Sequence, residues 1–229
     1  MPPLRRSPAI SHAERIDPLA PVSGAVPTNT CAVMTRRALG RQRGIVGVDM
    51  VTLNRLAELI DGLALAAAGR SPMSTPVIDL TIASLLADDP GPFGAVATHP
   101  FTIVASRDLH AELRLADPDN VARLRNESLR GCQAVHISSN SSAALADQWC
   151  DEADLFADAA RSVETQAPAG LRSLVLYLPQ ELYGLAIAFV RTLGERDDVL
   201  IVAELTGHPT ADARQLVDSL GRSVGLEPR

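Results

Sequence analysis

The stretch Val22-Ser-Gly-Ala-Val-Pro-Thr-Asn-Thr-Cys-Ala-Val-Met-Thr-Arg-Arg-Ala-Leu39 decides the fold of this chain. Its first residues form a short apolar run that a proline ends, which is the pattern of a buried strand. Thr28 or Asn29 can then cap a helix from about Thr30 to Leu39, with Gly40 at its end. A buried strand that leads directly into a helix is half of a parallel α/β unit.

The same order of strand and helix returns along the chain. A strand over Val46–Thr52 and a helix that Gly69 follows complete the first half. In the second half, the expected elements are strands over 171–178 and 199–205 and helices over 180–194 and 209–220. The pattern therefore predicts an α/β fold with a parallel sheet.

The residues between these halves have a helical pattern. Ser74-Thr-Pro76 and Thr98-His-Pro100 each place a hydroxyl cap and a first-turn proline before a helix. The four helices expected here cover 77–87, 101–115, 120–130 and 143–163. Residues 133–142 are ambiguous: Val135 and Ile137 are compatible with a strand, but the serine cluster favours a loop.

This pattern defines the expected domain organisation. Residues 1–17, rich in proline, serine and arginine, are expected to form a disordered leader. Residues 18–69 and 171–229 form the α/β layer, and residues 70–170 form a helical insertion.

The composition excludes several kinds of chemistry. All 21 basic residues among the 229 are arginines, so a P-loop lysine, a kinase strand lysine and a Schiff-base lysine are all lacking. Three cysteines do not form a disulfide framework and indicate a reduced, cytoplasmic setting. The sequence shows neither a signal-peptide apolar region nor a run of about 18 apolar residues, so no membrane association is expected.

Charge is distributed unevenly along the chain. Residues 1–43 contain seven arginines and two acids, a net charge of +5, whereas residues 44–229 contain 14 arginines and 25 acids, a net charge of −11. A basic N-terminal segment followed by an acidic remainder of the chain is consistent with a local contact with phosphates. The alternative is an arginine-bearing leader and one solvated helix face.

The segment Val26–Leu39 resembles the strand–Thr-Asn–helix motif (motif Ia) of UvrD/Rep-like superfamily 1 helicases, and Gly47–Ala57 resembles the element that follows it. The closer similarity is to the helicase-like N-terminal half of actinobacterial RecB-type or AddB-like helicase–nucleases. Segments 76–114, 149–155, 174–182 and 199–207 resemble, in order, that family's helical insertion, the return to the sheet and the last strands. The resemblance covers residues 18–221 and implies a P-loop NTPase type of sheet, as in helicase domain 1A.

The chain departs from this family at its catalytic motifs. The segment 18–26, where the P-loop would stand, lacks its glycine spacing and its lysine. Alignment on the Pro-Gln-Glu segment places Tyr177 and Leu178 where Walker B has Asp and Glu, the residues that hold Mg²⁺ and activate water. A PD-(D/E)xK nuclease site needs a lysine, and the chain ends at Arg229, before that domain would begin. We therefore expect no catalytic residue, no metal site and no cofactor in what looks like a short or truncated member.

The resemblance implies a DNA-binding or scaffolding module of a DNA recombination and repair family, and the missing motifs predict that it has no catalytic activity. Its partners would be single-stranded or duplex-end DNA and a nuclease or helicase subunit. The candidate DNA contacts are Thr28, Asn29, Arg36, Arg37 and Thr52, near a helix N-terminus whose free N–H groups suit a phosphate. In the alternative interpretation, Thr28 or Asn29 only caps the helix and the arginines are solvated.

Other functions stay open beside this one. The chain is also compatible with a truncated fragment that has no activity of its own, or with a subunit that supports an active nuclease encoded separately. A third possibility is an enzyme with the ATP-dependent unwinding and nuclease activity of its full-length relatives.

Three other motifs favour structural interpretations. Asp151-Glu-Ala-Asp154 reads as a DEAD box, but it lacks the preceding apolar strand and is explained more simply as an acidic helix start. Cys132, His136 and Cys150 lack paired zinc-ligand spacing and are expected to be buried thiols and a surface histidine. His99 and His110 are expected to be structural or solvated.

Overall fold

The computed structural model describes residues 21–43, 46–165, 173–177, 182, 184–195 and 199–202. The expected leader 1–17, the helix over 209–220 and Leu178 lie outside the described residues. The described residues belong to two compact units. One, here the α/β unit, takes its described residues from Met1–Ile60, Ala160–Leu182 and Phe189–Arg229, and the other, here the helical unit, from Asp61–Ala159 and Tyr183–Ala188.

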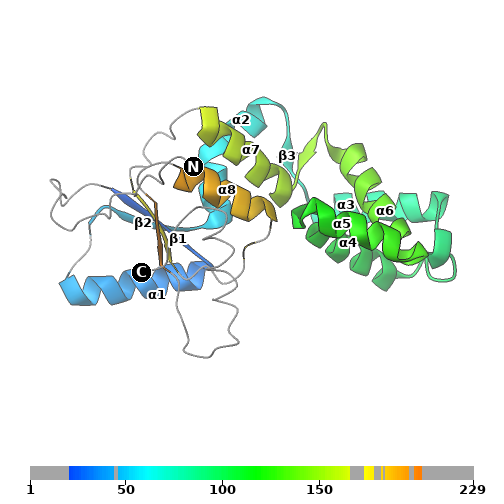
Figure 1. The fold of residues 1–229 in the computed structure, drawn as a ribbon, viewed down its shortest axis with the longest axis horizontal. Coiled ribbons are helices and arrows are strands. Elements are labelled where there is room, and N and C mark those ends of the chain that lie inside the picture. Colours follow the sequence, from blue (N-terminus) through cyan, green and yellow to red (C-terminus); the bar gives the residue numbers. More distant parts are fainter. Residues whose placement is uncertain are drawn as a thin grey trace, which may run out of the picture. The chain divides into compact units, whose positions relative to one another are not determined.

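The α/β unit is built on a parallel sheet, as the sequence predicts (Figure 1). The strands are β1 (Val22–Val26), β2 (Val48–Thr52), β5 (Leu174–Tyr177) and β6 (Val199–Val202), in the order β2-β1-β5-β6. All three pairings are parallel. The chain moves from β1 to one neighbour through a helix and later returns to the other side of β1, so β1 is a central strand.

Helices α1 (Asn29–Arg43) and α2 (Leu53–Ala67) follow β1 and β2 directly, and α8 (Gly184–Gly194) lies between β5 and β6. Apolar side chains of these strands and helices form the core of the α/β unit, because each faces away from water on a strand or on a helix stripe. The buried apolar residues described in this unit are Ala25, Val26, Ala32, Leu56, Ala57, Val163, Leu174, Leu176, Phe189, Val190 and Leu193.

Helix α1 is longer than the sequence indicates. It continues through Gly40 to Arg43, so the prediction that Gly40 ends it is wrong. Gly40 is exposed and has no atom near the position of a Cβ, so no packing demand fixes this glycine. Gly69 does end α2 as predicted: it has a φ of +78°, and the Arg70 amide donates back to the Leu65 carbonyl at 3.0 Å.

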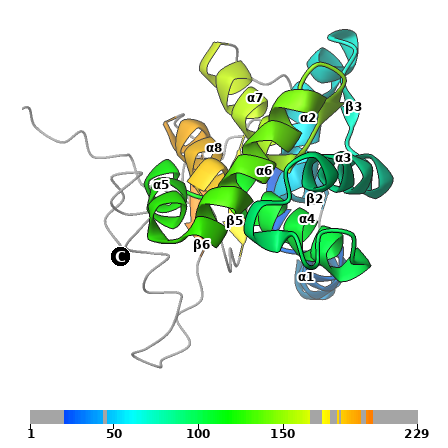
Figure 2. The same cartoon turned by 90° about the vertical axis from the view of Figure 1, so that its right-hand side faces the viewer.

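The helical unit contains a core of interlocking helices, with α6 packed against α3, α4 and α5 (Figure 2). Its main helices are α3 (Thr75–Asp88), α4 (Pro100–Leu115), α5 (Pro118–Glu127) and α6 (Leu129–Leu145), with a short 3₁₀ turn at Gly91–Phe93. The core residues are Ile78, Ile82, Leu86, Ala97, Ile137 and Leu145. A two-stranded parallel ladder of β3 (Ser71–Pro72) and β4 (Trp149–Cys150) leads into α7 (Glu152–Thr165).

The serine-rich stretch 133–142 is helical, so the expectation of a loop is wrong. The hydroxyl of Ser142 donates to the carbonyl of Ser138 at 3.1 Å, and Ser138 Oγ itself meets His110 on α4. One of these hydroxyls is thus bonded within the helix and one across to α4, so neither favours a turn here. The single helix expected over 143–163 is also wrong, because β4 separates α6 from α7.

The predicted helix starts agree with the structure in position, but the capping residues or their hydrogen bonds differ from the prediction. Ser74 is the N-cap of α3, but its hydroxyl makes no capping bond. His99, and not Thr98, caps α4 by accepting the Phe101 amide at Nδ1, at 3.2 Å. Ser128 separates α5 from α6 and accepts the Gly131 amide at 3.0 Å, so the helix expected over 120–130 ends earlier. None of the helices described here is long and apolar enough to span a bilayer.

Candidate nucleic-acid interface

The predicted contact residues lie at one edge of the sheet. Val26 of β1 is in register with Thr52 of β2, and because these strands are parallel their carboxyl ends share that edge. Thr28 and Asn29 follow β1, and Tyr177 ends β5 on the other side of β1. The structure therefore brings together Thr28, Asn29, Thr52 and Tyr177, where ligands of open parallel sheets commonly bind.

Both threonines are helix caps. Thr28 Oγ1 accepts the Cys31 amide, and Thr52 Oγ1 accepts the Arg55 amide, each at 3.2 Å. In each case the acceptor is the hydroxyl three residues before the amide, which is the usual N-cap arrangement. The capping role is thus present at both positions, and it occupies one lone pair of each hydroxyl and one free amide of each helix.

Helix α1 is a basic helix without acids. It carries Arg36, Arg37, Arg41 and Arg43 and no Asp or Glu. Helices α6 and α8 carry one arginine each and no acid, and the other described helices are neutral or acidic. Positive charge among the described helices is therefore concentrated on α1.

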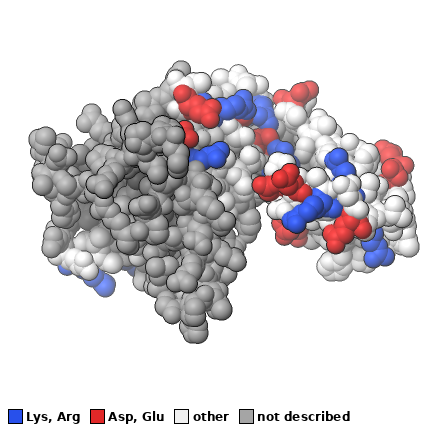
Figure 3. Space-filling model, viewed as in Figure 1, with Lys and Arg blue, Asp and Glu red and all other residues white. Residues whose placement is uncertain are grey.

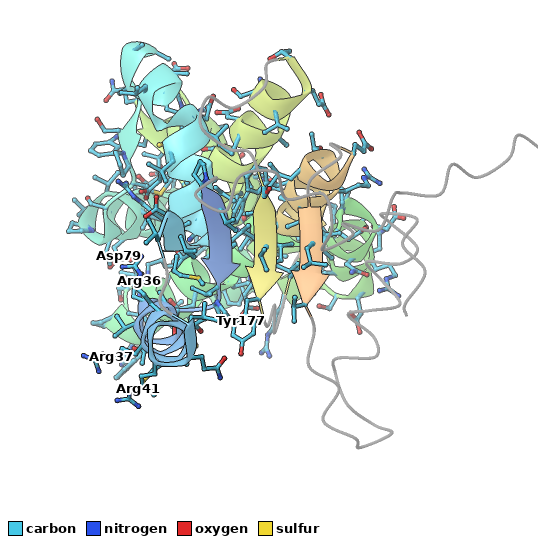
Figure 4. All side chains as sticks on the ribbon, turned by 90° about the vertical axis from the view of Figure 1, so that its left-hand side faces the viewer. Arg36, Arg37, Arg41, Asp79 and Tyr177 are labelled. Atoms are coloured by element: carbon cyan, nitrogen blue, oxygen red, sulfur yellow. The ribbon has the colours of Figure 1, made fainter. Side chains whose placement is uncertain are left out.

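Three arginines of α1 are solvent-exposed. Arg36, Arg37 and Arg41 are exposed, and no ion pair joins them to another described residue. Figure 4 looks along α1 and shows Arg37 and Arg41 extending away from the strands, with Arg36 on another side of the helix. In Figure 3 the visible part of α1 shows basic atoms and no acidic ones, whereas both signs are interspersed over the helical unit.

Arg41 belongs with Arg36 and Arg37 to the exposed arginines of α1, although it is not among the contacts predicted from the sequence. The signal that identifies it is helical spacing, because Arg37 and Arg41 are four residues apart on one face. The helix was expected to end at Gly40, so Arg41 fell outside it. Tyr177 is partly buried at the end of β5, and Leu178 lies outside the described residues.

The Asp151-Glu-Ala-Asp154 segment is the capped start of α7. Asp151 Oδ1 accepts the Asp154 amide at 2.8 Å, and Asp154 Oδ2 accepts the Asp151 amide at 3.2 Å. This reciprocal pair is a capping box with aspartate in the third helical position. The prediction of an acidic helix start is confirmed.

Two arginines bind these carboxylates and complete what we call the α7 arginine cluster: Arg70, Arg114, Asp151, Asp154 and Asp158. Arg114 contacts Asp151 at 2.7 Å and Asp154 at 2.5 Å, and Arg70 contacts Asp154 at 2.7 Å and Asp158 at 3.2 Å. Burial alone would raise the pKa of Asp151, but the hydrogen bonds and charge of Arg114 and the Asp154 amide lower it. These carboxylates are already paired within the helical unit, so they are structural groups.

The cysteines and His136 do not form a metal centre. Cys132 and His136 are both exposed on α6, and Cys150 is buried in β4. The expected surface histidine is correct, whereas the expected burial of Cys132 is wrong. Desolvation raises the pKa of the Cys150 thiol. In the part of the chain that the structure describes, no three His, Cys, Asp or Glu side chains are placed to hold a metal ion.

His110 is a buried residue whose environment the sequence did not reveal. It is 4% exposed between α4 and α6, and its Nδ1 lies 3.0 Å from Ser138 Oγ. The spacing of polar residues along α6 gave no signal for this contact, because that segment was not expected to be a helix.

Comparisons with known proteins add no family to this description. No protein-family model matches the chain, and no curated protein matches it either.

Proposed function

We propose that this chain is a helicase-like module of a DNA recombination and repair helicase–nuclease family, which binds DNA and does not hydrolyse ATP. Its sheet would be of the P-loop NTPase type found in helicase domain 1A, with β1 and α1 as the strand and helix of motif Ia. The module would act in the cytoplasm as a DNA-binding or scaffolding element beside a nuclease or helicase subunit.

The observation that carries this proposal is the charge of α1. Three exposed arginines, Arg36, Arg37 and Arg41, have no acidic partner among the described residues, and the helix contains no acid. By contrast, Arg70, Arg107 and Arg114 of the helical unit are all in ion pairs. Unpaired guanidinium groups on one helix suit phosphate oxygens, which accept bidentate, charge-assisted hydrogen bonds.

The position of α1 also supports the proposal. The helix starts at the carboxyl edge of the sheet, where Thr28 and Thr52 place hydroxyls and two helix N-termini next to each other along β1 and β2. Hydroxyl groups and helix N-termini contribute phosphate contacts in many nucleic-acid complexes. At the Walker B position, Tyr177 has no carboxylate, which favours binding without hydrolysis.

The test is the binding of a fluorescent single-stranded oligonucleotide to the full chain, measured by anisotropy between about 50 and 200 mM salt. We expect the double variant Arg36→Ala/Arg37→Ala to bind more weakly and to lower the salt slope by about 0.7 for each lost phosphate contact. The matched control is Arg125→Ala/Arg130→Ala, which removes the same charge from two exposed arginines of α5 and α6.

Each result discriminates between interpretations. Equal weakening by both double variants would show that only net charge matters, and would contradict a site on α1. A chain that does not bind at low salt would favour a fragment without independent activity. DNA-stimulated ATP hydrolysis would contradict the proposal that the module has no catalytic activity.

A further inference from the structure

His110 makes fewer polar contacts than its burial requires. Its Nδ1 meets Ser138 Oγ at 3.0 Å, but its Nε2 has no hydrogen-bond partner among the described residues. Ser141, one turn along α6 from Ser138 and fully buried, also has a hydroxyl without a partner in the described part of the chain. A neutral imidazole with one unpaired nitrogen is a modest cost in such a site, whereas an imidazolium with an unpaired N–H is a large one.

The acids whose charge acts on His110 already bind arginines. Arg114, one turn along α4, engages both oxygens of Asp151 and one of Asp154, and Arg70 takes the other oxygen of Asp154. Burial and Arg114 disfavour a protonated His110, whereas Asp151, a hydrogen bond to the Ser138 backbone and Asp154 favour it.

The two helices packed against α4 supply no further free acid. In α3, Asp79 is held by Arg107 of α4 at 3.1 Å, and Asp88 is exposed. In α6 the ionisable side chains are Arg130, Cys132 and His136, all of which are exposed. Burial is the largest influence on His110, and the pKa of its imidazole is lowered.

We propose that His110 is a pH sensor of the helical unit, and that its protonation opens the packing of α4 against α6. The imidazolium carries a proton on both ring nitrogens, and the proton on Nε2 reaches no acceptor among the described residues unless the side chain moves to water. His110 and Arg114 are four residues apart on α4, so a movement that exposes one also disturbs the other. Opening of this interface would therefore loosen the contacts of Arg114 with the α7 arginine cluster.

The direction of the pH effect follows from linkage. The unfolded chain binds a proton at His110 more readily than the folded chain, because the folded pKa is below 6.5. The stability due to neutral His110 is therefore complete above about pH 6.5 and is lost as the pH falls below it. One proton taken up raises the opening equilibrium constant by at most about tenfold per pH unit.

The test is amide hydrogen exchange on the full chain at mildly acidic and neutral pH, corrected for intrinsic exchange rates. We expect the protection of α4 and α6 amides to fall by up to about tenfold for each pH unit below 6.5, with no such fall in β1 and β5. The variant His110→Gln, neutral at every pH, should lose this dependence, and His136→Gln, at an exposed position of α6, should retain it.

Two results would overturn the proposal: wild-type protection that does not change with pH, or the same pH dependence in His110→Gln. If that variant does not fold, the nuclear magnetic resonance titration of His110 in the wild-type chain decides. It should titrate below 6.5 and together with the loss of α4 protection; a titration with no change in protection contradicts the proposal.

Discussion

Asp151 and Asp154 cap the same helix end reciprocally, each carboxylate accepting the backbone amide of the other, at 2.8 and 3.2 Å. The same two side chains receive the guanidinium of Arg114, so one pair of acids both starts α7 and holds it to α4. Cap and ion pair are therefore coupled, and removal of one carboxylate weakens both.

The first prediction concerns Asp154, which accepts bonds from both arginines of the cluster. We expect Asp154→Ala to lower the free energy of unfolding by about 2 kcal/mol, the usual loss for a partly buried hydrogen bond to a charged group. Chemical denaturation monitored by circular dichroism measures it. The control is Glu58→Ala, which breaks an exposed pair with Arg55 and should change stability by less than about 0.5 kcal/mol. An equal effect of both variants would contradict a structural role for the cluster.

The second prediction concerns acid stability. The folded chain lowers the pKa of Asp151 from 3.8, so the stabilisation is present above that value and is lost as the pH falls below it. We expect Asp151→Asn to be less stable than the wild type at neutral pH and the difference to shrink below about pH 4. Thermal unfolding at a series of pH values measures this. A difference that stays constant down to the lowest pH would show that ionisation of Asp151 is not the cause.

The third prediction separates the capping role of the threonines from a contact with DNA. Thr28→Ala and Thr52→Ala should each destabilise the chain by about 1 kcal/mol, because each removes an N-cap hydroxyl. Thr28→Ser and Thr52→Ser keep that hydroxyl and should be close to the wild type. Denaturation measures the effect on folding, and oligonucleotide binding is measured under conditions in which every variant is folded. Weaker binding by a serine variant of unchanged stability would show that the threonine methyl group also matters to the ligand.

The sequence predicts the α/β layer well because its signals are local. Strand β1 has the predicted bounds, and Thr28 and Gly69 act as helix cap and helix end because short backbone motifs need those residue types. Local sequence patterns mispredict secondary structure where contacts with other elements determine it. The serines of α6 indicate a loop in the sequence, but in the structure Ser138 meets His110 of α4 and Ser142 donates to a carbonyl within the helix.

In the candidate site, too, locally determined features are predictable from the sequence and long-range pairings are not. Thr28 and Thr52 are both predicted as candidate contacts because each stands where a strand leads into a helix, and the parallel pairing of β1 and β2 brings these two positions to one edge of the sheet. The pairing of Arg70 and Arg114 with acids more than thirty residues away has no local signature. The sequence alone therefore does not separate arginines that are available to a ligand from arginines that pair with acids. That distinction needs the fold.

The last prediction compares two helical glycines that the structure treats differently. A Cβ at Gly40 of α1 would meet no atom within 4 Å, whereas a Cβ at Gly131 of α6 would overlap the carbonyl oxygen of Leu124 on α5. Gly40→Ala should stabilise the chain by about 0.5–1 kcal/mol, because alanine loses less backbone entropy than glycine in a helix. Gly131→Ala should destabilise it by about 1–3 kcal/mol, since α5 and α6 must separate to admit the methyl group.

Denaturation of both variants against the wild type measures these opposite signs. Because α1 carries the proposed DNA surface, Gly40→Ala also reports on function: a better-formed helix with unchanged arginines should bind the oligonucleotide at least as tightly as the wild type. If Gly40→Ala instead weakened binding while raising stability, the ligand would approach the helix backbone at Gly40, and the contact surface would extend beyond the arginine side chains. If Gly131→Ala left the free energy of unfolding unchanged, this would contradict the close packing of α5 against α6 at Leu124.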